Sequence, residues 1–108
     1  MSDVSEPVNR FQVLATGDGW KLTGDIDAST APELAEAFGG ELPASGVVVV
    51  DIADVTFIDS SGLGVFVDLN ARMGSEMVTL RSAPRSVRRL LELTGLSSSF
   101  RFIETADD

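Results

Sequence analysis

The chain of 108 residues contains no cysteine and no histidine, and only one of its eight basic residues is a lysine. The absence of cysteine excludes a disulfide framework and a thiolate nucleophile. Because histidine is absent too, a Cys/His zinc site is also excluded. The lack of histidine also excludes Ser-His-Asp catalysis, because no imidazole is present to act as the base. The chemistry that remains uses carboxylates, hydroxyls and backbone groups.

Long apolar runs are missing as well. No run approaches the roughly 20 residues that a helix needs to cross a bilayer, so we expect no membrane insertion. The first seven residues lack the basic and apolar regions of a signal peptide, which predicts a cytoplasmic protein. The composition, with 44% apolar and 23% charged residues, is typical of one globular domain with a single core.

The charge is negative overall and unevenly distributed. A net charge of −9 argues against direct nucleic-acid binding, which depends on neutralising phosphates. Residues 1–71 hold 12 acidic and 2 basic residues, whereas residues 72–108 hold 5 acidic and 6 basic ones. These six are all arginines: Arg72, Arg81, Arg85, Arg88, Arg89 and Arg101. Two interpretations stay open, a solvated face that complements the acidic half or a protein-docking surface.

Hydrophobic periodicity and turn residues divide the chain into alternating strands and helices. The expected elements are strands at 11–15 and 20–23, a helix at 30–39, a strand at 47–52, a helix at 60–74, a strand at 76–80, a helix at 84–94 and a strand at 100–103. The order β-β-α-β-α-β-α-β predicts an α/β domain with a mixed sheet, antiparallel in the first hairpin and parallel afterwards. We expect the domain to span 10–104, between flexible tails at 1–9 and 105–108.

Several local signals support these boundaries. Thr30 and Glu33 fit a capping box at the start of the first helix, and Gly95 is well placed after the end of the last one. The β-branched run at 47–52 predicts a strand buried on both faces, followed by a short turn. The helix after this turn is apolar around most of its first turns, so we expect strong burial there.

Two aspartate motifs are tested first as catalytic centres. The segment from Asp25 through Asp27 to Ser29 loosely resembles the Asp-x-Asp nucleophile of haloacid-dehalogenase phosphatases, but such sites need a suitable lysine and further acids to hold magnesium. The only lysine, Lys21, lies in the preceding strand, so a helix-entry turn explains these aspartates better. Asp51 lies where response-regulator receivers carry their phosphorylated aspartate, yet the acidic pair and late lysine of receivers are absent. We expect Asp51 in a loop or at a sheet edge.

The third motif, Asp59-Ser60-Ser61-Gly62, precedes the second predicted helix. A single aspartate or serine here is usually a helix cap, which contributes about 1 kcal/mol. The motif contains more than one cap needs, and its small residues, with Gly64, are expected to keep the first turn open to a partner. Exposed amides and the positive end of the helix dipole favour a phosphate on Ser60.

The stretch from Val47 to Gly64 resembles the signature of the STAS domain, and in particular of anti-sigma factor antagonists. Further matches are Gly24-Asp25-Ile26-Asp27, Thr30-Ala31-Pro32-Glu33-Leu34 and Pro84-Arg85-Ser86-Val87-Arg88-Arg89-Leu90-Leu91-Glu92-Leu93-Thr94-Gly95-Leu96. The resemblance covers about residues 10–104. It departs from the family at the end, because members commonly carry a further helix after the last strand, so part of the partner surface is expected to differ.

The resemblance implies a non-enzymatic regulator without a cofactor. Ser60 matches the phosphoacceptor serine, and the implied partners are an anti-sigma factor that is itself a serine kinase and a serine phosphatase. The implied partner-binding residues are Asp25, Asp27, Ser29, Thr30, Asp59, Ser61, Gly62, Leu63 and Gly64. The alternative is a non-switching STAS scaffold in a stress-signalling or membrane-transport complex, in which Ser60 is only a cap and the arginine-rich helix is the docking face. A small phosphatase or nucleotide hydrolase ranks third.

Overall fold

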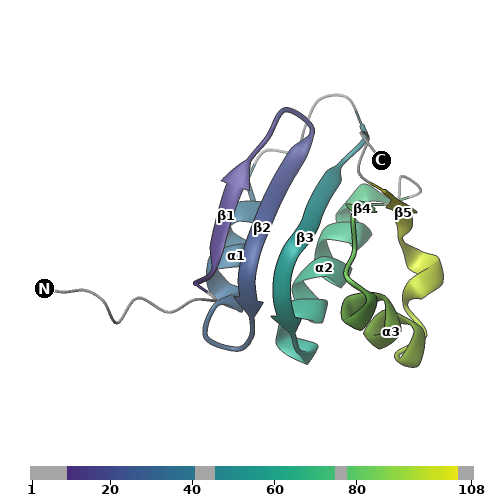
Figure 1. Cartoon of the computed structure of the whole chain (residues 1–108). Coiled ribbons are helices and arrows are strands. Elements are labelled where there is room, and N and C mark those ends of the chain that lie inside the picture. The colour runs from purple at the N-terminus through teal and green to yellow at the C-terminus, as the bar shows by residue number, and fades with distance from the viewer. Residues whose placement is uncertain (1–9, 41–45, 75–77, 105–108) are drawn as a thin grey trace, which may run out of the picture.

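The computed structural model describes residues 10–40, 46–74 and 78–104 (Figure 1). The elements in chain order are β1 (Gln12–Ala15), β2 (Gly19–Ile26), α1 (Ala31–Phe38), β3 (Val49–Ile58), α2 (Ser60–Met73), β4 (Thr79–Arg81), α3 (Arg85–Leu93), the 3-10 turn η1 (Ser97–Ser99) and β5 (Arg101–Ile103). The sequence pattern gave no sign of η1, and the other elements follow the expected order.

The strands form one sheet in the order β1-β2-β3-β4-β5 (Figure 1). β1 pairs with β2 in the antiparallel sense, and each later neighbour pairs in the parallel sense. A helix lies in each connection between parallel strands, because such strands cannot be joined by a tight hairpin turn. The predicted α/β fold with a mixed sheet is therefore confirmed.

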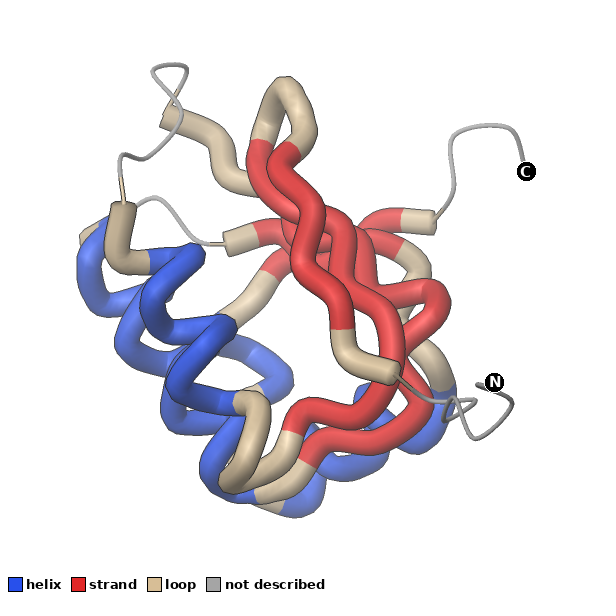
Figure 2. Tube along the Cα trace, turned by 90° about the vertical axis from the view of Figure 1, so that its left-hand side faces the viewer, coloured by secondary structure: helices blue, strands red, loops and turns tan. Residues whose placement is uncertain are grey.

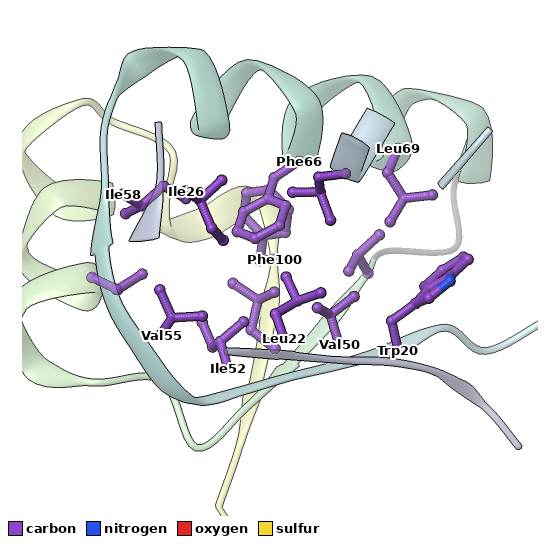
Figure 3. Close-up of a cluster of buried hydrophobic side chains, with 14 of the residues drawn as sticks. Trp20, Leu22, Ile26, Val50, Ile52, Val55, Ile58, Phe66, Leu69 and Phe100 are labelled. Atoms are coloured by element: carbon purple, nitrogen blue, oxygen red, sulfur yellow. The ribbon is translucent and has the colours of Figure 1, made fainter. Parts of the chain in front are cut away.

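Helices α1 and α2 lie side by side against one face of the sheet, whereas α3 lies toward the end of the sheet at which β3 ends (Figures 1 and 2). Buried apolar side chains fill the space between this face and the helices (Figure 3). The ring of Phe38 on α1 lies with its centroid 4.7 Å from that of Trp20 on β2 and 6.0 Å from that of Phe66 on α2. This aromatic contact joins both helices to the sheet.

Both strands that lead to the candidate site are longer than the sequence pattern indicates. β2 continues to Ile26 and β3 to Ile58, whereas turns are expected after residues 23 and 52. The strands continue because Ile26, Val55 and Ile58 are still buried in the core. The alternation of apolar and polar residues is interrupted in these strands, which resembles a turn in the sequence. The pairing of β2 with β3 accommodates the interruptions with two register shifts.

The expectation that Asp51 lies in a loop or at a sheet edge is wrong. Asp51 belongs to β3, the central strand, and its side chain is only 18% exposed. Its carboxylate faces the guanidinium of Arg81 on β4, with 3.3 Å between Oδ2 and Nε. This ion pair explains how a carboxylate is accommodated in the middle of the sheet.

The second helix is less buried at its start than expected. Gly62, Leu63 and Phe66 face the core, but Gly64 is exposed and the Val67 side chain is 39% exposed. α2 is therefore buried along one side only from its first turn, and its outward side begins with the small residues Ser60, Ser61 and Gly64.

The end of α3 agrees with prediction. Gly95 has a φ of +77°, and its N–H and that of Leu96 donate to the carbonyls of Glu92 and Leu91. This is a Schellman motif, in which glycine adopts the left-handed conformation at little cost.

Parts of the expectations lie outside the described residues: the tails at 1–9 and 105–108, the loop through Pro43 and the beginning of the strand predicted at 76–80. Among the described helices, none is both long enough and apolar enough to span a membrane.

Candidate functional site

Two loops meet at the edge of the sheet where the neighbouring parallel strands β2 and β3 end (Figure 1). Ile26 pairs with Ile58, so each strand reaches its last residue at the same level. The backbone N–H of Asp59 then donates to the carbonyl of Ile26 at 3.1 Å. The loop that leads into α1 and the first turn of α2 therefore start from adjacent positions.

Gly62 allows α2 to approach these strand ends closely. A Cβ at this position would lie 2.6 Å from Cγ2 of Ile26, 2.8 Å from Cγ1 of Ile58 and 3.0 Å from the carbonyl oxygen of Ile26. No side chain fits there unless the side chains of Ile26 and Ile58 shift. Gly62 thus serves packing, in contrast to Gly64, where an added Cβ would meet nothing within 4 Å.

Asp59 is the N-cap of α2 and satisfies the first turn without help from the serines. Its extended backbone places Oδ1 2.9 Å from the N–H of Ser61 and 3.2 Å from that of Gly62. Ser60, the first helical residue, is exposed, and its hydroxyl makes no hydrogen bond to any described residue. The two possible caps are thereby distinguished: Asp59 caps the helix, and the hydroxyl of Ser60 remains available.

The loop before α1 is organised around the carboxylate of Asp27. Its Oδ1 accepts from the hydroxyl of Ser29 at 2.8 Å, from the N–H of Ser29 at 3.0 Å and from the N–H of Thr30 at 3.2 Å. The hydrogen bond from the Ser29 hydroxyl is the largest cause of a lowered pKa for Asp27, which backbone donors reinforce and partial desolvation opposes. Asp27 is therefore held in its charged form.

The predicted capping box at Thr30 does not form. Thr30 is the N-cap residue of α1, but its side chain makes no cap hydrogen bond. Its hydroxyl instead donates to the carbonyl of Asp25 and accepts from the N–H of Asp27, both at 2.9 Å. The Thr30 hydroxyl thus forms hydrogen bonds within the loop and not to the first turn of α1. The half of the capping box that Thr30 should supply to Glu33 is therefore missing.

Asp25 is tied to the neighbouring strand by a contact that the sequence did not indicate. Its Oδ1 accepts from the hydroxyl of Thr56 on β3 at 2.6 Å. Gly24, just before it, has a φ of +88°, a left-handed conformation that favours glycine, at one of the register shifts between β2 and β3. Thr56 could not be found from the sequence, because its partner depends on that shifted register.

The structure brings all the sequence-predicted site residues to this one edge, but it exposes them differently. The exposed ones are Ser29, Ser60, Ser61 and Gly64. The half-buried ones are Asp25, Asp27, Thr30 and Asp59. Gly62 and Leu63 lie on the buried side of α2 and support this surface from beneath.

The surface is acidic. Asp25, Asp27 and Asp59 all lie at this edge, and within the described ranges none of them forms an ion pair with lysine or arginine. No three acidic side chains in the described part of the chain are arranged to hold a metal ion. The site thus offers an exposed hydroxyl beside the N–H groups of a helix start, with carboxylates around it. Such a hydroxyl is suited to accepting a modification.

Comparison with known proteins agrees with this arrangement. The family model described as "Mlab, STAS domain" matches residues 16–104 of this chain. The anti-sigma-B factor antagonist of Listeria monocytogenes serovar 1/2a is 42% identical over 81 residues, which cover 70% of this chain and 69% of that protein. The anti-sigma-B factor antagonist of Bacillus subtilis is 31% identical over 96 residues, covering 87% of this chain and 82% of that protein.

A solved structure shows the same architecture. The crystal structure of an anti-sigma factor antagonist from Mycobacterium paratuberculosis is 28% identical to this chain. It superposes with a TM-score of 0.71, over 92% of this chain and 88% of the other.

Proposed function

The chain belongs to the STAS domain family, and we propose that it is an anti-sigma factor antagonist that switches partners through Ser60. In its unphosphorylated form it binds an anti-sigma factor that is also a serine kinase, which frees the sigma factor for transcription. The kinase, with ATP and magnesium, phosphorylates Ser60 and releases the domain, and a serine phosphatase restores the first state. The domain acts in the cytoplasm as a binding protein without catalytic activity or a cofactor of its own.

The observation that carries this proposal is the hydroxyl of Ser60 at the start of α2, which makes no hydrogen bond to a described residue. Asp59 already caps the helix, so the hydroxyl of Ser60 is not needed for capping. Ser60 is exposed on the surface, where a kinase can reach it. The relatives named above as anti-sigma-B factor antagonists supply the class of partner.

The proposed contact surface consists of the exposed and half-buried residues around Ser60. They are Asp25, Asp27, Ser29, Thr30, Asp59, Ser61 and Gly64. Gly62 and Leu63 contribute by fixing the position of α2 against the strand ends. Because the loop hydrogen bonds hold this surface in place before binding, the partner meets a preorganised site.

Phosphorylation changes the charge of this surface without any need for refolding. A phosphate adds about −1.5 to −2 charges at neutral pH, next to Asp59 and on the same edge as Asp27. The positive end of the α2 helix dipole limits the cost to the folded domain. A partner that closes over this edge must bury the added charge beside existing carboxylates, so its affinity falls.

The experiment is a comparison of two variants at position 60. We expect Ser60→Ala to bind the cognate anti-sigma factor as tightly as the unphosphorylated protein, and Ser60→Asp to bind at least about tenfold more weakly. Binding is measured by calorimetry, with Ser61→Ala and Ser61→Asp as the matched pair at an exposed neighbour. Equal affinities for the two Ser60 variants would contradict switching and favour a non-switching interaction module.

A further inference from the structure

A groove lies between the end of β3 and helix α3. It has a volume of about 260 Å³. Its lining residues are Thr56, Phe57, Ile58, Ser86, Val87 and Leu90. Figure 1 shows α3 beside the end of β3. The described residues that line this groove are mostly apolar.

Two large apolar side chains are left in solvent, one that lines this groove and one on the helix beside it. Phe57, which lines it from β3, is 50% exposed. Leu93 on α3 is 73% exposed and lies one helical turn beyond the lining residue Leu90. Large apolar side chains that are exposed next to a groove are typical of a docking surface.

The arginines of α3 divide into two kinds. Arg88 is engaged: its guanidinium donates to Glu104 at 3.0 Å and lies over the Phe102 ring, 4.7 Å from the centroid. Arg85 and Arg89 are exposed one turn apart, and neither forms an ion pair with a described residue. Neither of them lines the groove, but both lie on the exposed side of α3, the helix that forms one wall of it.

We propose that this groove is a second docking surface, which binds an acidic amphipathic segment of a partner protein. Apolar side chains of the segment enter the groove over Phe57 and reach Leu93, while its carboxylates face Arg85 and Arg89. Charge complementarity sets this choice, because α3 carries two exposed arginines that form no ion pair with a described residue, on a chain whose net charge is −9. At the β3 wall of the groove, Thr56 donates to the carboxylate of Asp25. The negative charge of Asp25 repels the acidic side of the segment, which therefore faces α3.

This groove adjoins the surface around Ser60 but is lined by other residues. Neither Ser60 nor the loop around Asp27 lines it, whereas Phe57 and Ile58 lie directly before Asp59. The two surfaces are therefore tested separately, with Ser60 unphosphorylated. The arginine-rich helix is thus split by the structure, with Arg88 serving the fold and Arg85 and Arg89 serving the groove.

The test uses the unphosphorylated full chain and a displayed library of random peptides about 15 residues long, enough for roughly four helical turns. We expect the selected peptides to combine acidic residues with large apolar ones. Binding of a selected peptide, followed by fluorescence anisotropy, should weaken about tenfold in Phe57→Ser and in the double variant Arg85→Glu/Arg89→Glu. It should also weaken as salt rises, because part of the attraction is between exposed charges.

Matched controls separate the groove from general surface effects. Leu14→Ser removes a similarly exposed apolar side chain from β1, and Arg101→Glu reverses an exposed arginine on β5. Both should bind the peptide as the unaltered protein does. Selection of basic or uncharged peptides, or equal loss in the control variants, would overturn the proposal.

Two other molecules could fill the groove, and two further measurements distinguish them from a partner protein. If the groove instead joins two copies of this chain, light scattering would show a dimer that Phe57→Ser converts to a monomer, and this would overturn the proposal. If a synthetic peptide of residues 1–9 binds the groove and displaces the selected peptides, the occupant is the chain's own segment, which also overturns it. A monomer that does not bind the 1–9 peptide supports a partner protein.

Discussion

The turns that follow β2 and β3 use the same device with different outcomes. Asp27 and Asp59 each accept backbone N–H bonds from the residues two and three positions later. The distances are 3.0 and 3.2 Å in the first turn and 2.9 and 3.2 Å in the second. Both aspartates follow a parallel strand, and the strands are neighbours. The backbone framework of the two turns is thus nearly repeated.

The difference lies in the hydroxyls. In the first turn the hydroxyls of Ser29 and Thr30 are both hydrogen-bonded within the loop, and the residue directly after the aspartate is Ala28. In the second turn that position is Ser60, whose hydroxyl has no partner among the described residues. The first turn is therefore a closed polar network, and the second offers a reactive group to solvent.

The largest effect should be on stability, in a variant that pushes the start of α2 away from the ends of β2 and β3. Gly62→Ala places a Cβ against both strand ends, so we expect the free energy of unfolding to fall by about 1–3 kcal/mol, as for overpacked cores. Gly64→Ala is the matched control, because its Cβ meets nothing and alanine favours the helix. It should raise stability by about 0.5–1 kcal/mol. Urea unfolding measures both changes, and equal effects would show that α2 is not closely packed at Gly62.

A smaller effect should be the pH dependence of stability that comes from the hydrogen bonds of Asp27 in the first turn. The pKa of Asp27 in the folded protein is below its ordinary value of 3.8, so its charged form stabilises the fold. This contribution is complete above about pH 3.8 and is lost as the pH falls through the lowered pKa. Asp27→Asn should therefore be less stable than the unaltered protein at pH 7, and the gap should narrow below pH 3.8.

Urea unfolding at several pH values measures this gap. Asp68→Asn, at an exposed position on α2, is the control for removing one negative charge. A gap between the Asp27 variant and the unaltered protein that stays constant from pH 7 to below pH 3.8 would contradict the role of its carboxylate.

Much of this molecule could be predicted from its sequence, because periodicity and turn residues are local signals. The order of elements, the helix that begins at Ser60 and the ending at Gly95 all follow from such signals. The extent of β2 and β3 does not, because their last residues are held by burial and by register shifts between strands.

The details of the site depend on which of several competing hydrogen bonds forms. Thr30 has a typical capping sequence, yet its hydroxyl finds closer partners in the backbone of Asp25 and Asp27. The role of Gly62 in packing could not be predicted either, because the sequence does not distinguish a glycine packed against the core from one exposed on the surface. Contacts between strands, and not local propensity, decide these cases.

The most direct test of the account is to map the phosphate after incubation with the cognate kinase and ATP. Three proteins are compared by mass spectrometry of their peptides: the unaltered chain, Ser60→Ala, and the double variant Ala28→Ser/Ser60→Ala. The double variant places the free hydroxyl in the other turn. We predict phosphate at Ser60 in the unaltered chain and none in either variant. Phosphate at Ser29, Ser61 or position 28 in amounts equal to that at Ser60 would contradict the account.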